Sequence, residues 1–266
     1  MRMNSPEAVE SLDPGGKIAS WVVIVLLNIW VPVLMVLETV IGIAVFPIAL
    51  VAWRGVTRWP WGKIMRHFVW IYGRVWMWIV SPFVRIEQVG ADPKWADRPS
   101  VYVANHLSFF DVFCLAALPV FDAIVCLRSW PFKMIWFAPF MRLAEYLDFE
   151  SLPWEDIVDT TRGFFKEGHS VLVFPQGHRS RDGRLGRFYS GAFRLALQFD
   201  VPIIPICISG TDRVFPPGRR WLKPSRVRIE CLAPIDPAKF KGELGHIELR
   251  RHVKEKMEAC LANTRA

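Results

Sequence analysis

The sequence predicts an α/β protein with a largely parallel sheet covered by helices, preceded by an N-terminal membrane-embedded helical segment. Across residues 82–266, short apolar runs of strand length alternate with amphipathic runs of helix length. Strands that alternate with helices usually form a parallel sheet covered on both faces. Before this region, residues 18–37 and 39–53 contain no charged side chain, and only Glu38 interrupts them. Such a long uncharged stretch indicates a membrane contact.

The composition narrows the range of partners. The net charge is +8, from 33 Lys and Arg against 25 Asp and Glu, which favours an anionic partner such as nucleic acid or an anionic lipid surface. The basic residues alternate with Trp beside the apolar stretch, so we expect the anionic leaflet of a membrane and no nucleic acid. The five cysteines are odd in number and have no C-x-x-C spacing. They argue against a disulfide framework and a zinc site, and we expect buried thiols and no metal.

We expect the N-terminal part to consist of a flexible lead-in over residues 1–17 and membrane-anchoring helices over residues 18–81. A single helix over residues 21–53 would be about 50 Å long, well beyond the ~30 Å hydrocarbon core of a bilayer. Pro32 and Pro47 lie within it. Two arrangements therefore stay open: one tilted or kinked span, or two short helices that dip into one leaflet. A buried helix of a soluble protein is a third.

Basic residues follow the apolar stretch 18–53 directly, which marks the cytoplasmic side of a membrane. Within residues 62–81, a single helical face carries basic and aromatic side chains, namely Lys63, Arg66, His67, Trp70 and Arg74. This pattern predicts an amphipathic basic helix suited to an anionic membrane surface, although an ordinary surface helix has the same pattern. We expect location at the cell membrane, with the remaining domain on the cytoplasmic side.

The α/β domain is expected over residues 82–266. Apolar runs predict strands over residues 83–89, 100–104, 122–127, 170–174, 203–208 and 227–232. Helical patterns cover residues 112–118, 131–146, 155–166, 188–198 and 245–263.

A polar group lies where the strand 100–104 ends and the next helix begins. In open α/β sheets, ligands bind at the carboxyl ends of strands, and His106 and Asp111 fall there. The two can meet if His106 lies in the loop and Asp111 lies in the first helical turn. The carboxylate would then accept the imidazole N–H and leave the other nitrogen as a base. The alternative is structural, because Ser108-x-x-Asp111 is also a capping-box pattern.

A second polar loop, residues 175–183, follows the strand 170–174. Arg179 and Arg181 suit a phosphate group, because a guanidinium donates two hydrogen bonds from one planar fork. Gly177 lets the backbone approach a ligand closely. An exposed turn is the simpler interpretation of this loop alone.

Taken together, three stretches resemble the motifs of the glycerolipid acyltransferase family, which includes the 1-acylglycerol-3-phosphate acyltransferases. They are Asn-His-x4-Asp at 105–111, Phe-Pro-Gln-Gly-His-Arg-Ser at 174–180 and Val-Pro-Ile-Ile-Pro at 201–205. The resemblance covers roughly residues 60–235, and it implies a membrane-bound O-acyltransferase. The acyl chain would move from a thioester of coenzyme A or acyl carrier protein to the hydroxyl of a lysophospholipid, with 1-acylglycerol-3-phosphate giving phosphatidic acid. No bound cofactor is implied.

The resemblance also implies roles for single residues. His106 would be the general base, and Asp111 would orient it. Arg179, with Gly177 beside it, would bind the acceptor phosphate in the loop that also holds Gln176. Arg128, Lys133 and His178 are open candidates for further positive charge at the acceptor. The acyl-donor side would be shaped by Val201, Pro202, Ile203 and Pro205.

Two departures from the family pattern leave the acceptor open. The third motif of the family usually reads Phe-Pro-Glu-Gly-Thr-Arg-Ser, whereas Gln176 and His178 stand here for Glu and Thr. In residues 143–151, Glu150 stands near where the family has Arg. Another single-chain lipid acceptor and a catalytically inactive lipid-binding relative therefore remain alternatives. A hydrolase that uses Ser108 as nucleophile is a further one, although no Gly-x-Ser-x-Gly motif is present.

Overall fold

A seven-stranded sheet organises the computed structural model, which describes residues 14–135, 137–215 and 218–265. The strands are β1 (Val84–Val89), β2 (Val101–Ala104), β3 (Ala123–Leu127), β4 (Leu147–Asp148), β5 (Ser170–Val173), β6 (Ile203–Ser209) and β7 (Ser225–Cys231). Their order is β1-β7-β6-β2-β5-β3-β4, and every neighbouring pair is parallel except β6 and β7. The predicted α/β class and largely parallel sheet are confirmed.

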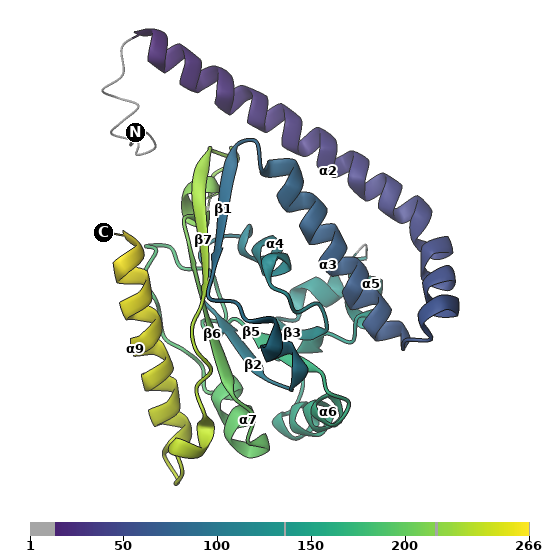
Figure 1. Cartoon of the computed structure of the whole chain (residues 1–266), viewed down its shortest axis with the longest axis vertical. Helices are drawn as coiled ribbons and strands as arrows, with labels where there is room; N and C mark the ends of the chain where they lie inside the picture. The colour runs from purple at the N-terminus through teal and green to yellow at the C-terminus, as the bar shows by residue number, and fades with distance from the viewer. Residues whose placement is uncertain (1–13, 136, 216–217, 266) are drawn as a thin grey trace.

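Helices cover both faces of this sheet (Figure 1). They are α2 (Pro14–Thr57), α3 (Trp61–Val80), α4 (Asp111–Cys114), α5 (Ala138–Leu143), α6 (Trp154–Lys166), α7 (Gly191–Phe199), α8 (Thr211–Val214) and α9 (Gly245–Arg265). Single 3₁₀ turns cover residues 93–97, 115–117, 130–133 and 237–239. One buried cluster joins α3 and α4 to the sheet, and a second joins α7 and α9 to the opposite face. All four residues of β2 are therefore buried, as expected for a central parallel strand.

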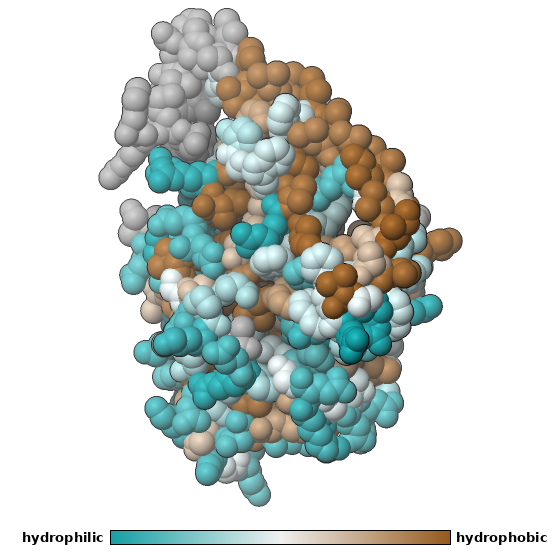
Figure 2. Space-filling view, turned by 45° about the vertical axis from the view of Figure 1, so that its right-hand side comes forward, coloured by the Kyte–Doolittle hydropathy of each residue, from teal (hydrophilic) through white to brown (hydrophobic). Residues whose placement is uncertain are grey.

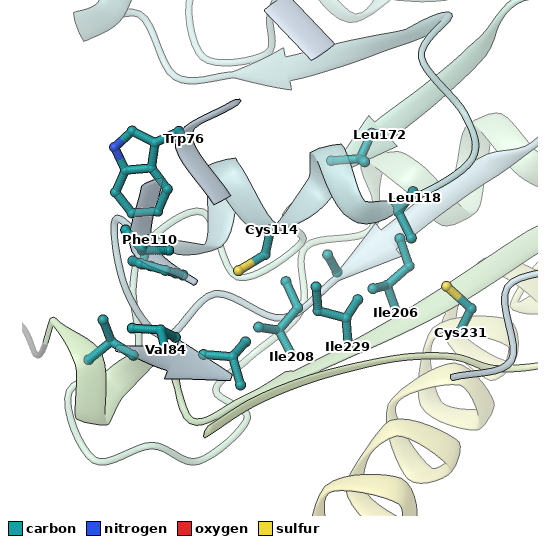
Figure 3. Close-up of a cluster of buried hydrophobic side chains, with 14 of the residues drawn as sticks. Trp76, Val84, Phe110, Cys114, Leu118, Leu172, Ile206, Ile208, Ile229 and Cys231 are labelled. Atoms are coloured by element: carbon teal, nitrogen blue, oxygen red, sulfur yellow. The ribbon is translucent and has the colours of Figure 1, made fainter. Parts of the chain in front are cut away.

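The cluster under α3 and α4 fixes the loop that follows β2 (Figure 3). Cys114 of α4 belongs to the same cluster as Ile206 and Ile208 of β6, and all three are buried. Phe110 packs edge-on against Trp76 of α3, with ring centroids 4.5 Å apart. Burying side chains of this size contributes about 1.5–3 kcal/mol each. The loop is thus held between the sheet and α3.

Some predicted elements differ from those observed. The helix expected over residues 131–146 is wrong: a 3₁₀ turn over 130–133 is followed by the short α5. Pro131 and Pro139 explain this, because proline has no N–H for a helical hydrogen bond and is favoured in a first turn. The helix expected over 112–118 is a single α-turn followed by a 3₁₀ turn. The two-residue β4 is too short to show a period in sequence.

The apolar N-terminal segment is one continuous helix, α2, with Pro32 and Pro47 inside it. Figure 1 shows it as a single rod that bends in its last turns. At 1.5 Å per residue its 44 residues span roughly 66 Å. The arrangement as two short helices is therefore wrong, and the part from Ser20 to Thr57 is long and apolar enough to cross a membrane. The predicted lead-in lies outside the described residues up to residue 13, and residues 14–17 already belong to α2.

The first half of α2 docks on the α/β domain through a narrow stripe. Leu27 and Val31 are buried against α3, and the indole of Trp30 donates to the Ile79 carbonyl at 2.9 Å. The Asn28 amide pairs with both backbone groups of Leu222, at 2.8 and 2.9 Å. The rest of α2 exposes apolar side chains, which form the brown band in Figure 2. An apolar surface this large indicates contact with a membrane or a partner.

One residue of the basic face predicted for α3 is buried inside the protein. Arg66 is 1% exposed. Its guanidinium donates to Asp122 at 2.7 Å, to Glu145 at 2.7 Å and to the Ala144 carbonyl at 3.1 Å. Lys63 lies 3.3 Å from Asp122 as well. The expectation of an anionic-surface helix is therefore wrong for Arg66, because acidic side chains of the α/β domain compensate its charge.

Candidate active site

The loop after β2 leaves the sheet in a fixed direction. Asn105, fully buried, extends the pairing of β2 with β6: its Nδ2 donates to the Ile208 carbonyl at 2.8 Å, and its Oδ1 accepts from the Ile208 N–H at 2.7 Å. The side chain thus replaces the next pair of ladder hydrogen bonds. Because β5 and β6 lie on either side of β2, His106 stands at the carboxyl edge where the strand order changes direction. This is where α/β sheets bind ligands.

His106 and Asp111 meet as the sequence predicts. The Nδ1 of His106 lies 2.7 Å from Oδ2 of Asp111, which is fully buried. An ionised carboxylate only accepts hydrogen bonds, so Nδ1 carries the proton and Nε2 has the free lone pair. No residue that the structure describes bonds to Nε2, and the His106 side chain is 18% exposed. The imidazole is therefore held on one side and open on the other.

Asp111 also accepts hydrogen bonds from backbone N–H groups just before α4. The catalytic and the structural interpretations of this residue are therefore compatible. Its Oδ2 accepts from the backbone N–H of Leu107 at 2.6 Å and of Ser108 at 2.8 Å. The Ser108 hydroxyl in turn accepts from the Phe110 N–H at 3.2 Å, so the side chains of Ser108 and Asp111 bind backbone N–H groups in the turn that leads into α4. Oδ1 accepts from the Thr211 hydroxyl at 2.5 Å. Four hydrogen bonds thus fix the carboxylate that fixes the imidazole.

The loop after β5 is tied to the loop that carries His106. The side-chain amide oxygen of Gln176 accepts from the backbone N–H of His106 at 3.0 Å. The backbone N–H of Ser180 donates to the His106 carbonyl at 2.8 Å. Gly177 has φ +69°, and a Cβ on it would lie 3.1 Å from the Tyr189 ring, so a side chain there would be strained. Gln176 is 1% exposed, and its Nε2 has no hydrogen-bond partner among the described residues. The backbone of the second loop thus lies against His106.

The predicted cationic residues differ in how far their charges are compensated. Arg128 forms an ion pair with Glu150, and hydrogen bonding from Arg128 lowers the pKa of that carboxylate. His178 and Arg179 are both exposed, and the Arg179 guanidinium has no partner among the residues that the structure describes. Arg179 lies in the same loop as Gln176, at the His106 edge of the sheet. It is thus an uncompensated cation in the loop that is hydrogen-bonded to the His106 backbone.

The residues predicted for the acyl-donor side do not reach this edge. Val201 and Pro202 precede β6, at its amino end. Ile203 pairs with Val101 and Pro205 with Val103, well before the level of His106. Val201, Ile203 and Pro205 are buried in the sheet core. The structure therefore places this stretch as a central strand and does not bring its side chains to His106.

Sequence reasoning missed Thr211, and it left Ser108 open as a nucleophile. Thr211 follows β6 just as His106 follows β2, so a polar residue after that strand was the available signal. The hydroxyl of Ser108 is buried and donates to the Phe215 carbonyl at 2.5 Å. It is therefore directed away from the imidazole. Among the described residues, no cluster of His, Cys, Asp and Glu could hold a metal ion.

Comparison with known proteins finds a family and several relatives that are similar to this chain. Residues 85–209 match the family model described as Acyltransferase. The chain is 30% identical over 213 residues to the chloroplastic 1-acyl-sn-glycerol-3-phosphate acyltransferase LPAT1 of Arabidopsis thaliana, covering 75% of this chain and 56% of the relative. It is 29% identical over 171 residues to the 1-acyl-sn-glycerol-3-phosphate acyltransferase of Salmonella typhimurium, covering 61% and 67%.

A solved structure shares the fold. The crystal structure of the 1-acyl-sn-glycerophosphate acyltransferase PlsC from Thermotoga maritima matches with a TM-score of 0.69 and 22% identity, over 88% of this chain and 96% of that one. The chain spans a little over half the length of the plant relatives it matches. Residues 85–209 thus form an acyltransferase-family domain, and the chain resembles the 1-acyl-sn-glycerol-3-phosphate acyltransferases of that family.

Proposed function

We propose that this protein is a membrane-bound O-acyltransferase that moves an acyl chain from a thioester to the hydroxyl of a lysophospholipid. The proposed acceptor is 1-acylglycerol-3-phosphate, which gives phosphatidic acid. One observation carries the proposal: an imidazole fixed by a buried carboxylate presents a free Nε2, and the loop that carries Arg179 is hydrogen-bonded to the His106 backbone. The named activity of the relatives supports it.

The proposed chemistry follows from this arrangement. Nε2 of His106 takes the proton of the acceptor hydroxyl while the oxygen attacks the thioester carbonyl carbon. The C–O bond forms, the C–S bond breaks, and the leaving thiolate takes the proton back from the imidazolium. The negative charge of Asp111 stabilises the imidazolium formed in between. A thioester needs no further activation, so no metal or bound cofactor enters the proposal.

Arg179 is the proposed binding group for the acceptor phosphate, together with the backbone beside Gly177. A guanidinium binds phosphate with two charge-assisted hydrogen bonds, and this one has no competing carboxylate among the described residues. Arg128 is a weaker candidate, because Glu150 already pairs with it. The Gln176 amide oxygen still accepts the His106 N–H, as a carboxylate there would. The change to Gln therefore gives no reason for inactivity.

The membrane location is part of the same proposal. The exposed apolar surface of α2 would lie in the bilayer, and Asn28 ties this helix to the loop before β7. The Ser108 hydroxyl is bonded to Phe215 at the start of that loop. The acceptor lipid would then reach His106 from the membrane side. We place the protein at the cell membrane, with the α/β domain in the cytoplasm.

Acyl transfer by the purified full-length protein tests the proposal. A radiolabelled acyl thioester is offered with a panel of lysolipids, and labelled phosphatidic acid is the expected main product. His106→Ala should lower the rate by about 10²–10⁴-fold while the melting temperature is kept. Lipid binding without transfer to any acceptor would contradict the proposal and favour a non-catalytic relative. Hydrolysis of the thioester without an acceptor would favour the hydrolase.

A further inference from the structure

A second polar site lies beside the candidate active site and is not used by the proposed chemistry. It is a cavity of about 710 Å³, within the range of small-molecule sites. Strands β1, β7 and the end of β6 line it, and the last turns of α9 close it with Asn263 and Thr264. Leu107, next to His106, and Gly210, next to Thr211, also line it. The cavity therefore opens at the edge of the sheet where His106 lies.

Two arginines in this cavity stand side by side without compensation. Arg85 on β1 is in register with Arg226 on the parallel strand β7. Both are exposed, and neither forms an ion pair with any residue that the structure describes. Like charges directly opposite on neighbouring strands are destabilising. Such a pair gains stability when an anion binds between the two guanidinium groups.

The next register pair on the same face of the sheet carries opposite charges. Glu87 stands beside Arg228, and their side chains form an ion pair at 3.2 Å. Glu230 pairs with Arg228 from the same strand at 3.0 Å. Glu87 and Glu230, the two acidic side chains on these strands, are thus both paired with Arg228. A third arginine, Arg213, also lines the cavity, where Asp212 is the remaining acid.

The position of the cavity indicates which substrate it serves. Val84 and Val227, the strand neighbours of Arg85 and Arg226, point into the core under α3. Side chains alternate along a strand, so the two arginines face the opposite side of the sheet, on which α9 lies. Arg179 follows β5, on one side of β2, whereas the cavity lies at the end of β6 and the starts of β7 and β1, on the other side of β2.

We infer that this cavity binds phosphate groups on the carrier of the acyl thioester, so that donor and acceptor reach His106 from opposite sides of β2. The inference rests on the proposed acyltransferase function. The shared chemistry is the phosphate of the phosphopantetheine arm, which both coenzyme A and acyl carrier protein contain. Coenzyme A carries additional nucleotide phosphates. Guanidinium pairs suit either source, because they bind phosphate in a bidentate manner.

Equilibrium binding to the full-length protein in detergent tests the inference without turnover. The variant is Arg85→Gln/Arg226→Gln, and the probes are coenzyme A, the phosphopantetheinylated carrier protein and pantetheine without phosphate. Arg98→Gln is the matched control, because it removes an exposed arginine near the amino end of β2. We expect the double variant to bind at least one phosphorylated carrier about tenfold more weakly or worse, with pantetheine binding unchanged. If the double variant loses affinity for coenzyme A alone, the cavity binds the nucleotide phosphates of coenzyme A.

Kinetics separate this inference from the proposed function. In the double variant, KM for the donor should rise by about tenfold while kcat and KM for the lysolipid stay near those of Arg98→Gln. Arg85→Lys/Arg226→Lys keeps both charges and should recover part of the donor affinity. Unchanged binding of every phosphorylated carrier by the double variant, or no carrier binding by the unchanged protein, would overturn the inference. A protein that transfers no acyl group to any acceptor contradicts the proposed function, and the binding results still decide the cavity.

Discussion

Two His–Asp pairs stand at opposite ends of the same sheet, and they differ in what surrounds them. At the carboxyl edge, His106 Nδ1 lies 2.7 Å from Asp111. At the amino edge, His169 Nδ1 lies 3.0 Å from Asp122. The second nitrogen of His106 has no described partner, whereas that of His169 faces Arg66 at 3.4 Å and Glu167 at 3.3 Å.

The comparison shows that a His–Asp hydrogen bond does not by itself indicate catalysis. His169 is closed in by Arg66, whose charge is compensated by Asp122 and Glu145. This network joins α3 to the loops before β3 and β5, so it holds the domain together. His106 leaves one nitrogen open at the edge where Arg179 is uncompensated. The free second nitrogen and the free cation nearby distinguish the candidate active site from the structural one.

The largest expected effect comes from changing Asp111, the carboxylate of the pair in which one nitrogen of His106 stays open. We call His106 and Asp111 the open pair, and His169 and Asp122 the closed pair. Asp111→Asn removes the charge that stabilises an imidazolium and places an amide where three N–H groups and a hydroxyl donate. We expect kcat to fall by about 10³-fold or more. Steady-state acyl transfer measures it, and Asp122→Asn is the control. Equal losses of kcat per folded molecule in the two variants would remove the distinction between the pairs.

The next effect concerns stability at the closed pair. Arg66→Met leaves Asp122 and Glu145 without their buried cation, and breaking such a pair typically costs about 3–5 kcal/mol. Thermal unfolding in detergent should show a large fall in melting temperature with kcat per folded molecule unchanged. Arg128→Met, which breaks the exposed pair with Glu150, should change the melting temperature little. A melting temperature kept in Arg66→Met would show that this network does not hold the domain together.

A smaller effect is expected for the uncompensated cation. Arg179→Gln removes the proposed phosphate ligand without leaving a carboxylate unpaired. Charge-assisted hydrogen bonds of about 1.5–3 kcal/mol correspond to a rise in KM of roughly 10–100-fold for a phosphate-bearing acceptor. Kinetics with 1-acylglycerol-3-phosphate measure this, and a monoacylglycerol without phosphate should show no such rise. An unchanged KM for the phosphate-bearing acceptor would assign its binding to other residues.

The smallest expected effect is a pH dependence of stability that belongs to the closed pair. Burial raises the pKa of Asp122, but hydrogen bonds and charge from His169 and Arg66 outweigh it and hold the pKa well below its ordinary value of 3.8. The ionised form is therefore favoured in the folded state, and its contribution is complete above the ordinary pKa and is lost as the pH falls below it. Melting curves between pH 3 and 6 should show a steeper acid loss for the unchanged protein than for Asp122→Asn. Parallel curves would contradict this assignment.

Sequence patterns predicted every strand of the sheet except the two-residue β4, because each of the others is a short apolar or alternating run. They also predicted that His106 and Asp111 meet, since the strand end and the helix start fix both. Two features of long-range packing could not be read in this way. Arg66 lies on a helical face that looks suited to a membrane, and only its partners, far along the chain, show that Arg66 itself is buried. Thr211 reaches Asp111 across a hundred residues.

Long-range packing of the N-terminal helix α2 could not be read from the sequence either. Its length and lack of charge are visible in the sequence, whereas its continuity through two prolines, its packing against α3 and the pairing of Asn28 with Leu222 are not. The helix expected over residues 131–146 is not continuous. Its apolar side chains belong to a 3₁₀ turn and to α5, and each of these elements has a proline in its first turn.

The most direct test compares the two histidines in one experiment. His106→Gln and His169→Gln are purified in the same detergent, and kcat for acyl transfer is measured with the melting temperature of each. The account predicts that His106→Gln loses about 10²–10⁴-fold in kcat and keeps its melting temperature, whereas His169→Gln keeps kcat per folded molecule and melts at a lower temperature. A His106→Gln protein with normal kcat, or a His169→Gln protein with the greater loss of kcat, would contradict it.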